Sequence, residues 1–234
     1  MRKAMFSMIA AAAAALSSVA LAAPAKTPVV VELFTAQGCA PCVKANELVA
    51  GMADRAGVLP LTFSVDYWDY LGWADTYAKP AFAERQRAYV SRLQLRDPYT
   101  PQVVIDGRAQ ASGAKPQDVD KLIREAAEAG RNPPDMLMRE DGKVAVGSGP
   151  APRGGGEVWL VRYDPKPTEV QVRRGDNRGE TIVYRNAVRD VVRLGAWNGR
   201  PRIYSVPAGE DAGLESVVLV QAAKGGRVIG VLRP

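Results

Sequence analysis

The chain has 234 residues, with two cysteines, no histidine and 31 Lys and Arg side chains against 25 Asp and Glu, which gives a net charge of +6. This length is enough for one large domain or two small ones that each bury a core, and we expect two. The basic residues are spread along the chain without a Lys/Arg block, so the sequence argues against nucleic acid as a partner.

The first 22 residues have the pattern of a secretory signal peptide. Arg2 and Lys3 precede an apolar run over residues 4–19, and Ala20-Leu21-Ala22 follows it, just before Pro24. A positive start, a short apolar stretch and a small-x-small site are typical of a cleaved signal. We expect cleavage after residue 22 and a periplasmic or secreted location. No later stretch is apolar enough to span a bilayer, so we expect no stable membrane insertion after cleavage.

Residues 27–130 alternate apolar runs with amphipathic segments, which is the pattern of an α/β domain. Uninterrupted apolar runs are typical of strands covered on both faces, and a helix between two of them predicts a parallel crossover unit. Pro80 and Pro116 suit the first turn of a helix, and Asp106-Gly107 predicts a hairpin turn. We expect strands at 28–34, 59–65, 102–105 and 108–111, and helices at 40–56, from 80 onwards and at 115–129.

The character of the chain changes after residues 131–135, which we interpret as a linker. Residues 136–234 contain short alternating runs separated by Gly, Pro, Asp and Asn turns, and this spacing predicts a smaller all-β domain that resembles a β-sandwich. The expected strands cover residues 143–147, 157–163, 168–173, 181–194, 202–206, 214–222 and 227–232.

Cys39 and Cys42 lie where the first expected strand gives way to a helix. A disulfide that closes so short a loop contributes little stability, so the pair is unlike a structural bridge. Free backbone N–H groups and the helix dipole favour a thiolate at a helix start. We expect Cys39 to be an exposed nucleophile and Cys42 to be the more buried resolving residue. The redox-active disulfide would need no separate cofactor.

Other interpretations of the cysteine pair compete with this one. Zinc needs four ligands, and the chain offers no histidine and no third cysteine. The methionines that would complete a copper site do not cluster with the cysteines, so we expect no metal site and treat a metal chaperone as a remote alternative. The serious competitor is an inert disulfide in a non-catalytic periplasmic binding module.

Thr100-Pro101 stands immediately before the expected strand at 102–105. A cis proline here would place backbone beside the cysteines and offer an edge to an extended peptide. The alternative is an ordinary trans proline that starts a strand.

The order of elements, together with Cys39-Ala40-Pro41-Cys42 and Thr100-Pro101, resembles the thioredoxin fold over residues 27–130. More closely, residues 31–39, 65–73 and 99–102 resemble a family of secreted bacterial proteins catalogued as a domain of unknown function. The thioredoxin resemblance implies exchange with protein or peptide thiols and disulfides, and a membrane electron donor as a further partner. Pro41 is similar to the reducing thioredoxin pattern, which favours a reductant or an isomerase. The resemblance to the second family does not supply a physiological reaction.

Thioredoxins keep a buried acid beneath the cysteines as a proton acceptor, and this resemblance implies that role for Glu32. A carboxylate in an otherwise apolar strand is rarely buried without a partner or a task, so we expect a raised pKa. A solvent-facing side chain at the strand end is the alternative.

Residues 66–77 are rich in aromatic side chains and follow the second expected strand. Most such clusters belong to a core, but the carboxyl ends of strands in α/β folds also bind ligands, so part of this one is expected to wall a substrate groove. Its two carboxylates, Asp66 and Asp69, are expected either to bind substrate or to cap the turn. The expected substrate contacts are Gln37, Asp66, Tyr67, Trp68, Asp69 and Thr100.

Overall fold

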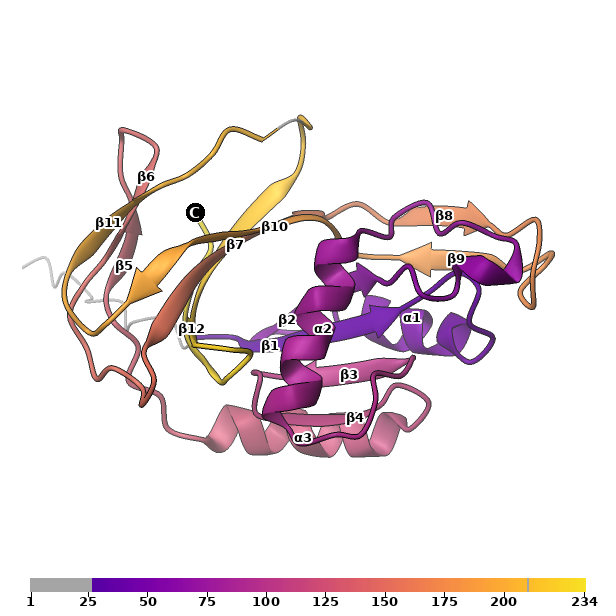
Figure 1. Ribbon diagram of the computed structural model, residues 1–234, viewed down its shortest axis with the longest axis horizontal. Coiled ribbons are helices and arrows are strands. Elements are labelled where there is room, and N and C mark those ends of the chain that lie inside the picture. The colour runs from indigo at the N-terminus through magenta and orange to yellow at the C-terminus, as the bar shows by residue number, and fades with distance from the viewer. Residues whose placement is uncertain (1–26, 210) are drawn as a thin grey trace, which may run out of the picture.

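The computed structural model describes residues 27–209 and 211–234, so the expected signal peptide at 1–22 lies outside the described residues. Its centre is one eight-stranded sheet in the order β13-β12-β7-β10-β2-β1-β3-β4 (Figure 1). These strands are β1 (Val29–Thr35), β2 (Val58–Ser64), β3 (Gln102–Ile105), β4 (Ala109–Ser112), β7 (Gly156–Asp164), β10 (Ala187–Trp197), β12 (Glu215–Ala222) and β13 (Val228–Leu232). The helices are α1 (Cys42–Ala50), α2 (Pro80–Arg92), α3 (Pro116–Glu128) and the short 3-10 helix η1 (Asp69–Leu71).

Helices cover both faces of the N-terminal part of this sheet. β1 and β2 are parallel, β3 is antiparallel to β1, and β4 is antiparallel to β3. Alternate residues of a strand point to opposite faces. Val31 and Leu33 therefore pack with side chains of α1 and α3, whereas Phe34 packs with Phe82 and Tyr89 of α2. The predicted mixed α/β architecture is confirmed, and the continuous apolar runs are explained by cover on both faces.

Two helices begin where the prolines predict, and one ends early. α2 starts at Pro80 and α3 at Pro116. α1 ends at Ala50, rather than continuing to residue 56, because Gly51 follows and the chain turns tightly. In that turn the amide of Met52 donates to the Val49 carbonyl at 3.0 Å, a three-residue spacing that does not continue an α-helix.

The largest sheet is not confined to the C-terminal half, as the expected separate β-sandwich would require. β10 pairs in parallel with β2 through Ala187 and Thr62, so strands from both halves share one sheet. The Asn186 side chain also donates to the Pro60 carbonyl at 2.9 Å. An unpaired strand edge leaves backbone groups unsatisfied, and β10 satisfies the edge of β2. The expected strand at 181–194 is broken at Asn186, which has a φ of 50°.

A second, three-stranded sheet packs on part of the first. It has the order β11-β6-β5, with β5 (Met136–Met138), β6 (Lys143–Val146) and β11 (Arg202–Ser205). Val144 and Val146 of this sheet contact Val158, Leu160 and other side chains of the large sheet. The two sheets are therefore stacked as in a sandwich, but the larger sheet also contains the strands of the N-terminal half. The expected linker at 131–135 forms no helix or strand.

A hairpin from the C-terminal half returns to the beginning of the chain. It consists of β8 (Thr168–Gln171) and β9 (Thr181–Tyr184), which lie beside α1 in Figure 1. Ile182 and Tyr184 of the hairpin pack with Val43 of α1 and with Trp73 and Tyr77. The C-terminal half therefore helps to build the surroundings of the cysteines.

Candidate functional site

The two cysteines form a disulfide between β1 and α1. Cys39 follows the short turn after β1, and Cys42 is the first residue of α1. Their Cα atoms are 5.3 Å apart, and the Cys42 amide donates to the Cys39 carbonyl at 3.0 Å. The first sulfur therefore lies at the amino end of a helix, where the dipole favours negative charge.

Neither cysteine is accessible in this disulfide form, although Cys39 is expected to be exposed when reduced. Both residues have 0% of their surface exposed, whereas Ala40 and Pro41 between them are exposed. Trp68 of the aromatic segment 66–73 lies beside the turn that carries Cys39, because a Cβ atom at Gly38 would lie 3.5 Å from the Cβ of Trp68. Tyr67 and Trp68 pack against the same cluster of buried side chains as the two cysteines.

Asn177 holds the turn that carries Cys39, and the sequence did not single it out. Its side-chain amide donates to the carbonyl of Gln37 at 2.8 Å and to that of Cys39 at 2.9 Å. Asn177 is buried in the loop between β8 and β9. In the sequence this loop has only the character of a Gly/Asp/Asn turn, which gives no sign of its partner.

Gln37 is part of the interior rather than of a substrate surface. Its side chain is fully buried and donates to Thr76 Oγ1 at 2.9 Å, while its Oε1 accepts from Trp73 Nε1 at 2.8 Å. Its backbone amide donates to Asp75 Oδ2 at 2.7 Å. The expected substrate contact is therefore corrected to a structural one, because every polar group of the side chain is already bonded within the protein.

Asp75 is the buried carboxylate of the site, and sequence reasoning selected its neighbours instead. Burial raises the pKa of Asp75 to about 6. Asp69 accepts a hydrogen bond from the Asp75 amide at 3.0 Å, as in the turn-capping alternative, and Asp66 is half-buried. The hydroxyls of Ser64 and Tyr184 are buried without a hydrogen-bond partner among the described residues. Desolvation and the charge of Asp75 raise the pKa of Tyr184 well above its usual value.

The structure brings three of the expected substrate contacts together. Trp68 Nε1 donates to Thr100 Oγ1 at 2.8 Å, and the Tyr67 hydroxyl donates to Gln86 of α2 at 3.1 Å. Burial raises the pKa of Tyr67 to about 12, so it remains protonated. These contacts tie segment 66–73 to α2 and to the start of β3.

The peptide bond between Thr100 and Pro101 is cis, as predicted. Pro101 is buried close to α1, because a Cβ atom at Gly113 would lie 3.0 Å from the Cβ of Pro101 and 2.9 Å from that of Ala45. Pro101 therefore belongs to the packing between β3 and the helix that carries Cys42.

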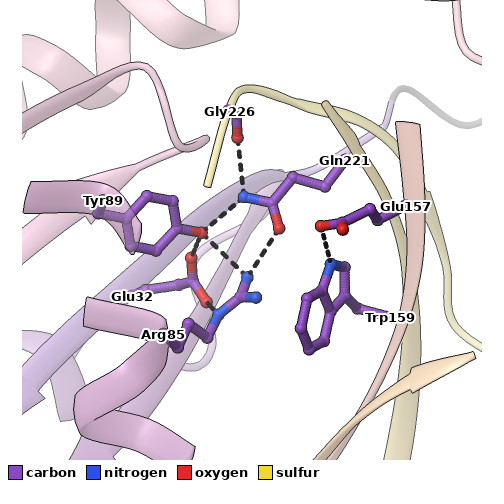
Figure 2. A network of polar contacts seen from close by, with 7 residues as sticks. All are labelled: Glu32, Arg85, Tyr89, Glu157, Trp159, Gln221 and Gly226. Atoms are coloured by element: carbon purple, nitrogen blue, oxygen red, sulfur yellow. Dashed lines mark hydrogen bonds and ion pairs between the residues drawn. The ribbon is translucent and has the colours of Figure 1, made fainter. Parts of the chain in front are cut away.

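Glu32 is buried in a polar network on the face of β1 that packs against α2 (Figure 2). Its carboxylate forms an ion pair with Arg85 Nε at 2.7 Å and accepts a hydrogen bond from the Tyr89 hydroxyl. Arg85 also donates to Gln221 of β12 at 3.3 Å, so the network joins the two halves of the chain. The solvent-facing alternative is wrong. Glu32 contacts Arg85 and Tyr89 and neither cysteine. These contacts therefore provide no direct route by which a proton could pass from a cysteine thiol to the Glu32 carboxylate.

Among residues 27–209 and 211–234, no helix is long and apolar enough to cross a membrane. No group of three or more Cys, Asp or Glu side chains in the same part of the chain is placed to hold a metal ion.

A family model described as protein of unknown function, DUF1223, matches residues 30–221. The chain belongs to the DUF1223 family. The expected resemblance to a family catalogued as a domain of unknown function is thus confirmed. The region shared with DUF1223 includes the cysteines, Asn177 and Gln221, so the Asn177–Cys39 and Arg85–Gln221 contacts fall inside it.

Two solved structures are similar to this DUF1223 chain. Protein AGR_C_4864 from Agrobacterium tumefaciens is 31% identical, with a TM-score of 0.69 over 87% of this chain and 92% of that one. HBP35 of Porphyromonas gingivalis is 14% identical, with a TM-score of 0.59 over 89% of this chain and 75% of that one, a likeness of fold alone. No curated protein matched the chain.

Proposed function

We propose that this DUF1223 protein is an exported thiol-disulfide oxidoreductase built on a thioredoxin-like domain. The observation that carries the proposal is the Cys39–Cys42 disulfide at the amino end of α1. The strand order β2-β1-β3-β4, with α1 and α3 on one face and α2 on the other, supports the thioredoxin-like part. The pattern of residues 1–22 supports export to the periplasm or beyond.

The proposed reaction moves two electrons from the cysteine pair to a protein or peptide disulfide. The Cys39 thiolate attacks one substrate sulfur, so the substrate S–S bond breaks, a mixed disulfide forms and one substrate thiolate leaves. The Cys42 thiolate then attacks Cys39, which forms the Cys39–Cys42 bond and releases the second substrate thiolate. A dithiol donor at the membrane would return the two electrons in the next cycle. The helix dipole at the start of α1 favours the Cys39 thiolate.

The covered sulfurs require a movement before any substrate can react. Trp68 lies against Gly38, and its Nε1 donates a hydrogen bond of 2.8 Å to Thr100 Oγ1, just before β3. This hydrogen bond is the contact that would have to break. Exchange needs a nucleophile within bonding reach of the substrate sulfur. The aromatic segment therefore acts as a cover that the substrate displaces.

The same burial favours a second candidate function, a binding module with an inert disulfide. Both cysteines are fully buried and their turn is already held by Asn177. In this case the disulfide would only fix the turn, and the chain would exchange no electrons.

Alkylation after reduction separates the two functions. We expect iodoacetamide at neutral pH to label Cys39 much faster than Cys42, because only Cys39 lies at the end of the helix where a thiolate is favoured. Equal and slow labelling of both residues would favour the inert disulfide.

Covalent trapping gives a second readout. Cys42→Ser should accumulate mixed disulfides through Cys39, because the resolving thiol is missing, and the matched Cys39→Ser variant should accumulate few. If Cys42→Ser yields no more adducts than Cys39→Ser, a protein substrate is excluded.

A further inference from the structure

Four arginines from separate segments line one hollow of about 510 Å³. Arg92 lies in the last turn of α2, Arg108 in the turn between β3 and β4, Arg153 before β7 and Arg227 before β13. None of the described residues that line the hollow is acidic. The volume is in the range of small-molecule sites, roughly 300 to 1,000 Å³. We propose that this hollow binds a small polyanion that carries two or more phosphate groups.

The arginine side chains are available to such a ligand. All four residues are exposed, and none of their guanidinium groups makes a hydrogen bond or ion pair with any residue in the described ranges 27–209 and 211–234. Elsewhere in the protein arginines do find partners, as Arg131 does with Asp106 at the edge of the same region. Four unpaired like charges around one hollow repel each other, and a bound anion would remove that repulsion.

The turns that carry Arg108 and Arg227 are held rigidly against each other. A Cβ atom at Gly107 would collide with the carbonyl oxygen of Gly226, so only glycine allows this approach. The Gly226 carbonyl also accepts a hydrogen bond from the buried Gln221 side chain at 2.7 Å (Figure 2). The Val228 amide donates to the Asp106 carbonyl at 2.7 Å. Their backbone positions are thus set by the buried core and not by loose loops.

The chemistry of the side chains points to phosphate. A guanidinium group offers two parallel N–H donors that match two oxygens of one phosphate, which a lysine cannot do. One orthophosphate carries at most about two charges near neutral pH, so four arginines match a ligand with several phosphate groups better. Such a ligand could be free in solution or be part of a lipid headgroup, and the experiment separates these sources.

The hollow is independent of the proposed oxidoreductase function. Gly107 lines the hollow, and its neighbour Asp106 accepts a hydrogen bond from the Val30 amide near the start of β1. The cysteines instead follow the end of β1 at Thr35. The two sites therefore lie at opposite ends of the central strand. The redox potential of the cysteine pair is measured without tripolyphosphate or vesicles, so failure of one proposal is distinguishable from failure of the other.

Calorimetric titration of the full chain with tripolyphosphate at fixed ionic strength tests the proposal. We expect saturable binding to one site, and binding roughly tenfold or more weaker for the double variant Arg108→Gln/Arg227→Gln, since it removes two charge-assisted donors. The matched control Arg87→Gln/Arg124→Gln removes the same charge from exposed positions on α2 and α3, and it should bind within about twofold of the parent. Thermal unfolding without ligand checks that the variants fold.

A second arm uses vesicles that contain cardiolipin, a lipid whose headgroup carries two phosphate groups. Vesicle binding that tripolyphosphate displaces and that the double variant loses would assign the site to a lipid headgroup, and its absence would assign it to a free polyanion. Absence of saturable tripolyphosphate binding, or an equal loss in the control, would overturn the proposal.

Discussion

The side-chain amide of Asn177 donates a hydrogen bond of 2.9 Å to the carbonyl oxygen of Cys39, although the two residues are 138 positions apart in the chain. A second bond from the same amide reaches the Gln37 carbonyl. The shape of the turn before the first cysteine therefore depends on the loop between β8 and β9. This relationship makes the C-terminal half part of the candidate site.

Asn177→Ala should destabilise the protein, because it leaves the carbonyls of Gln37 and Cys39 buried without their donor. We expect a loss of about 1–3 kcal/mol in the free energy of unfolding, measured by urea denaturation. The exposed Asn132 offers a matched control, and Asn132→Ala should change the value by less than about 0.5 kcal/mol. If Asn177→Ala is as stable as Asn132→Ala, the hairpin does not hold the cysteine turn.

Trp68→Phe should make the reduced Cys39 easier to alkylate, because it removes the hydrogen bond to Thr100 and keeps an aromatic ring. A hydrogen bond contributes about 0.5–1.5 kcal/mol net, so the rate should rise roughly 2- to 10-fold. Thr100→Val removes the other partner, and the double variant should react no faster than either single one. Independent, multiplying effects of the two substitutions would show that this bond does not hold the cover closed.

Asp75→Asn should change how stability depends on pH. Burial raises the pKa of Asp75 from 3.8 to about 6 in the folded protein. Between these values the folded state binds more protons than the unfolded state, so this group's contribution to stability falls as pH rises. The variant should therefore gain about 2.4 kcal/mol relative to the parent between pH 4 and pH 7. Asp106 has a similarly raised pKa, but it is present in both the parent and the variant, so its contribution cancels in the difference between their stabilities. A stability difference that stays constant with pH would contradict the assignment.

Glu32→Gln should be strongly destabilising, because it leaves the buried Arg85 guanidinium without its ion-pair partner. Removing one member of a buried pair costs about 3–5 kcal/mol. The double variant Glu32→Gln/Arg85→Met also removes the stranded charge and should recover part of that loss. Equilibrium unfolding measures both, and a double variant less stable than Glu32→Gln would contradict this description of the network.

The local features of the N-terminal half followed from the sequence, because they depend on neighbours in the chain. Continuous apolar runs predicted strands that are covered on both faces, and Pro80 and Pro116 predicted helix starts. Cys39 and Cys42 were placed at the start of α1 on the same grounds. These predictions needed only hydrophobic period and backbone chemistry.

The contacts between distant segments did not follow from the sequence. The pairing of β10 with β2 depends on a strand edge that no local pattern reveals, so the C-terminal strands were expected to form their own sandwich. Asn177 has the sequence character of an ordinary turn residue, and the burial of Asp75 depends on segments that fold around it. The burial of Cys39 in the disulfide form likewise depends on packing between distant segments, since Tyr67 and Trp68 belong to the surroundings of the same buried cluster.

The most direct test of the redox proposal is the reduction potential of the Cys39–Cys42 pair, measured by equilibrating the purified protein with glutathione mixtures and counting its free thiols. A working oxidoreductase should have a potential between roughly −270 and −120 mV, and a reductant or isomerase should lie in the lower part of that range. Structural disulfides lie below about −300 mV and resist the glutathione pool. A pair that stays oxidised in every glutathione mixture would contradict the proposed function and leave the inert-disulfide binding module as the better description.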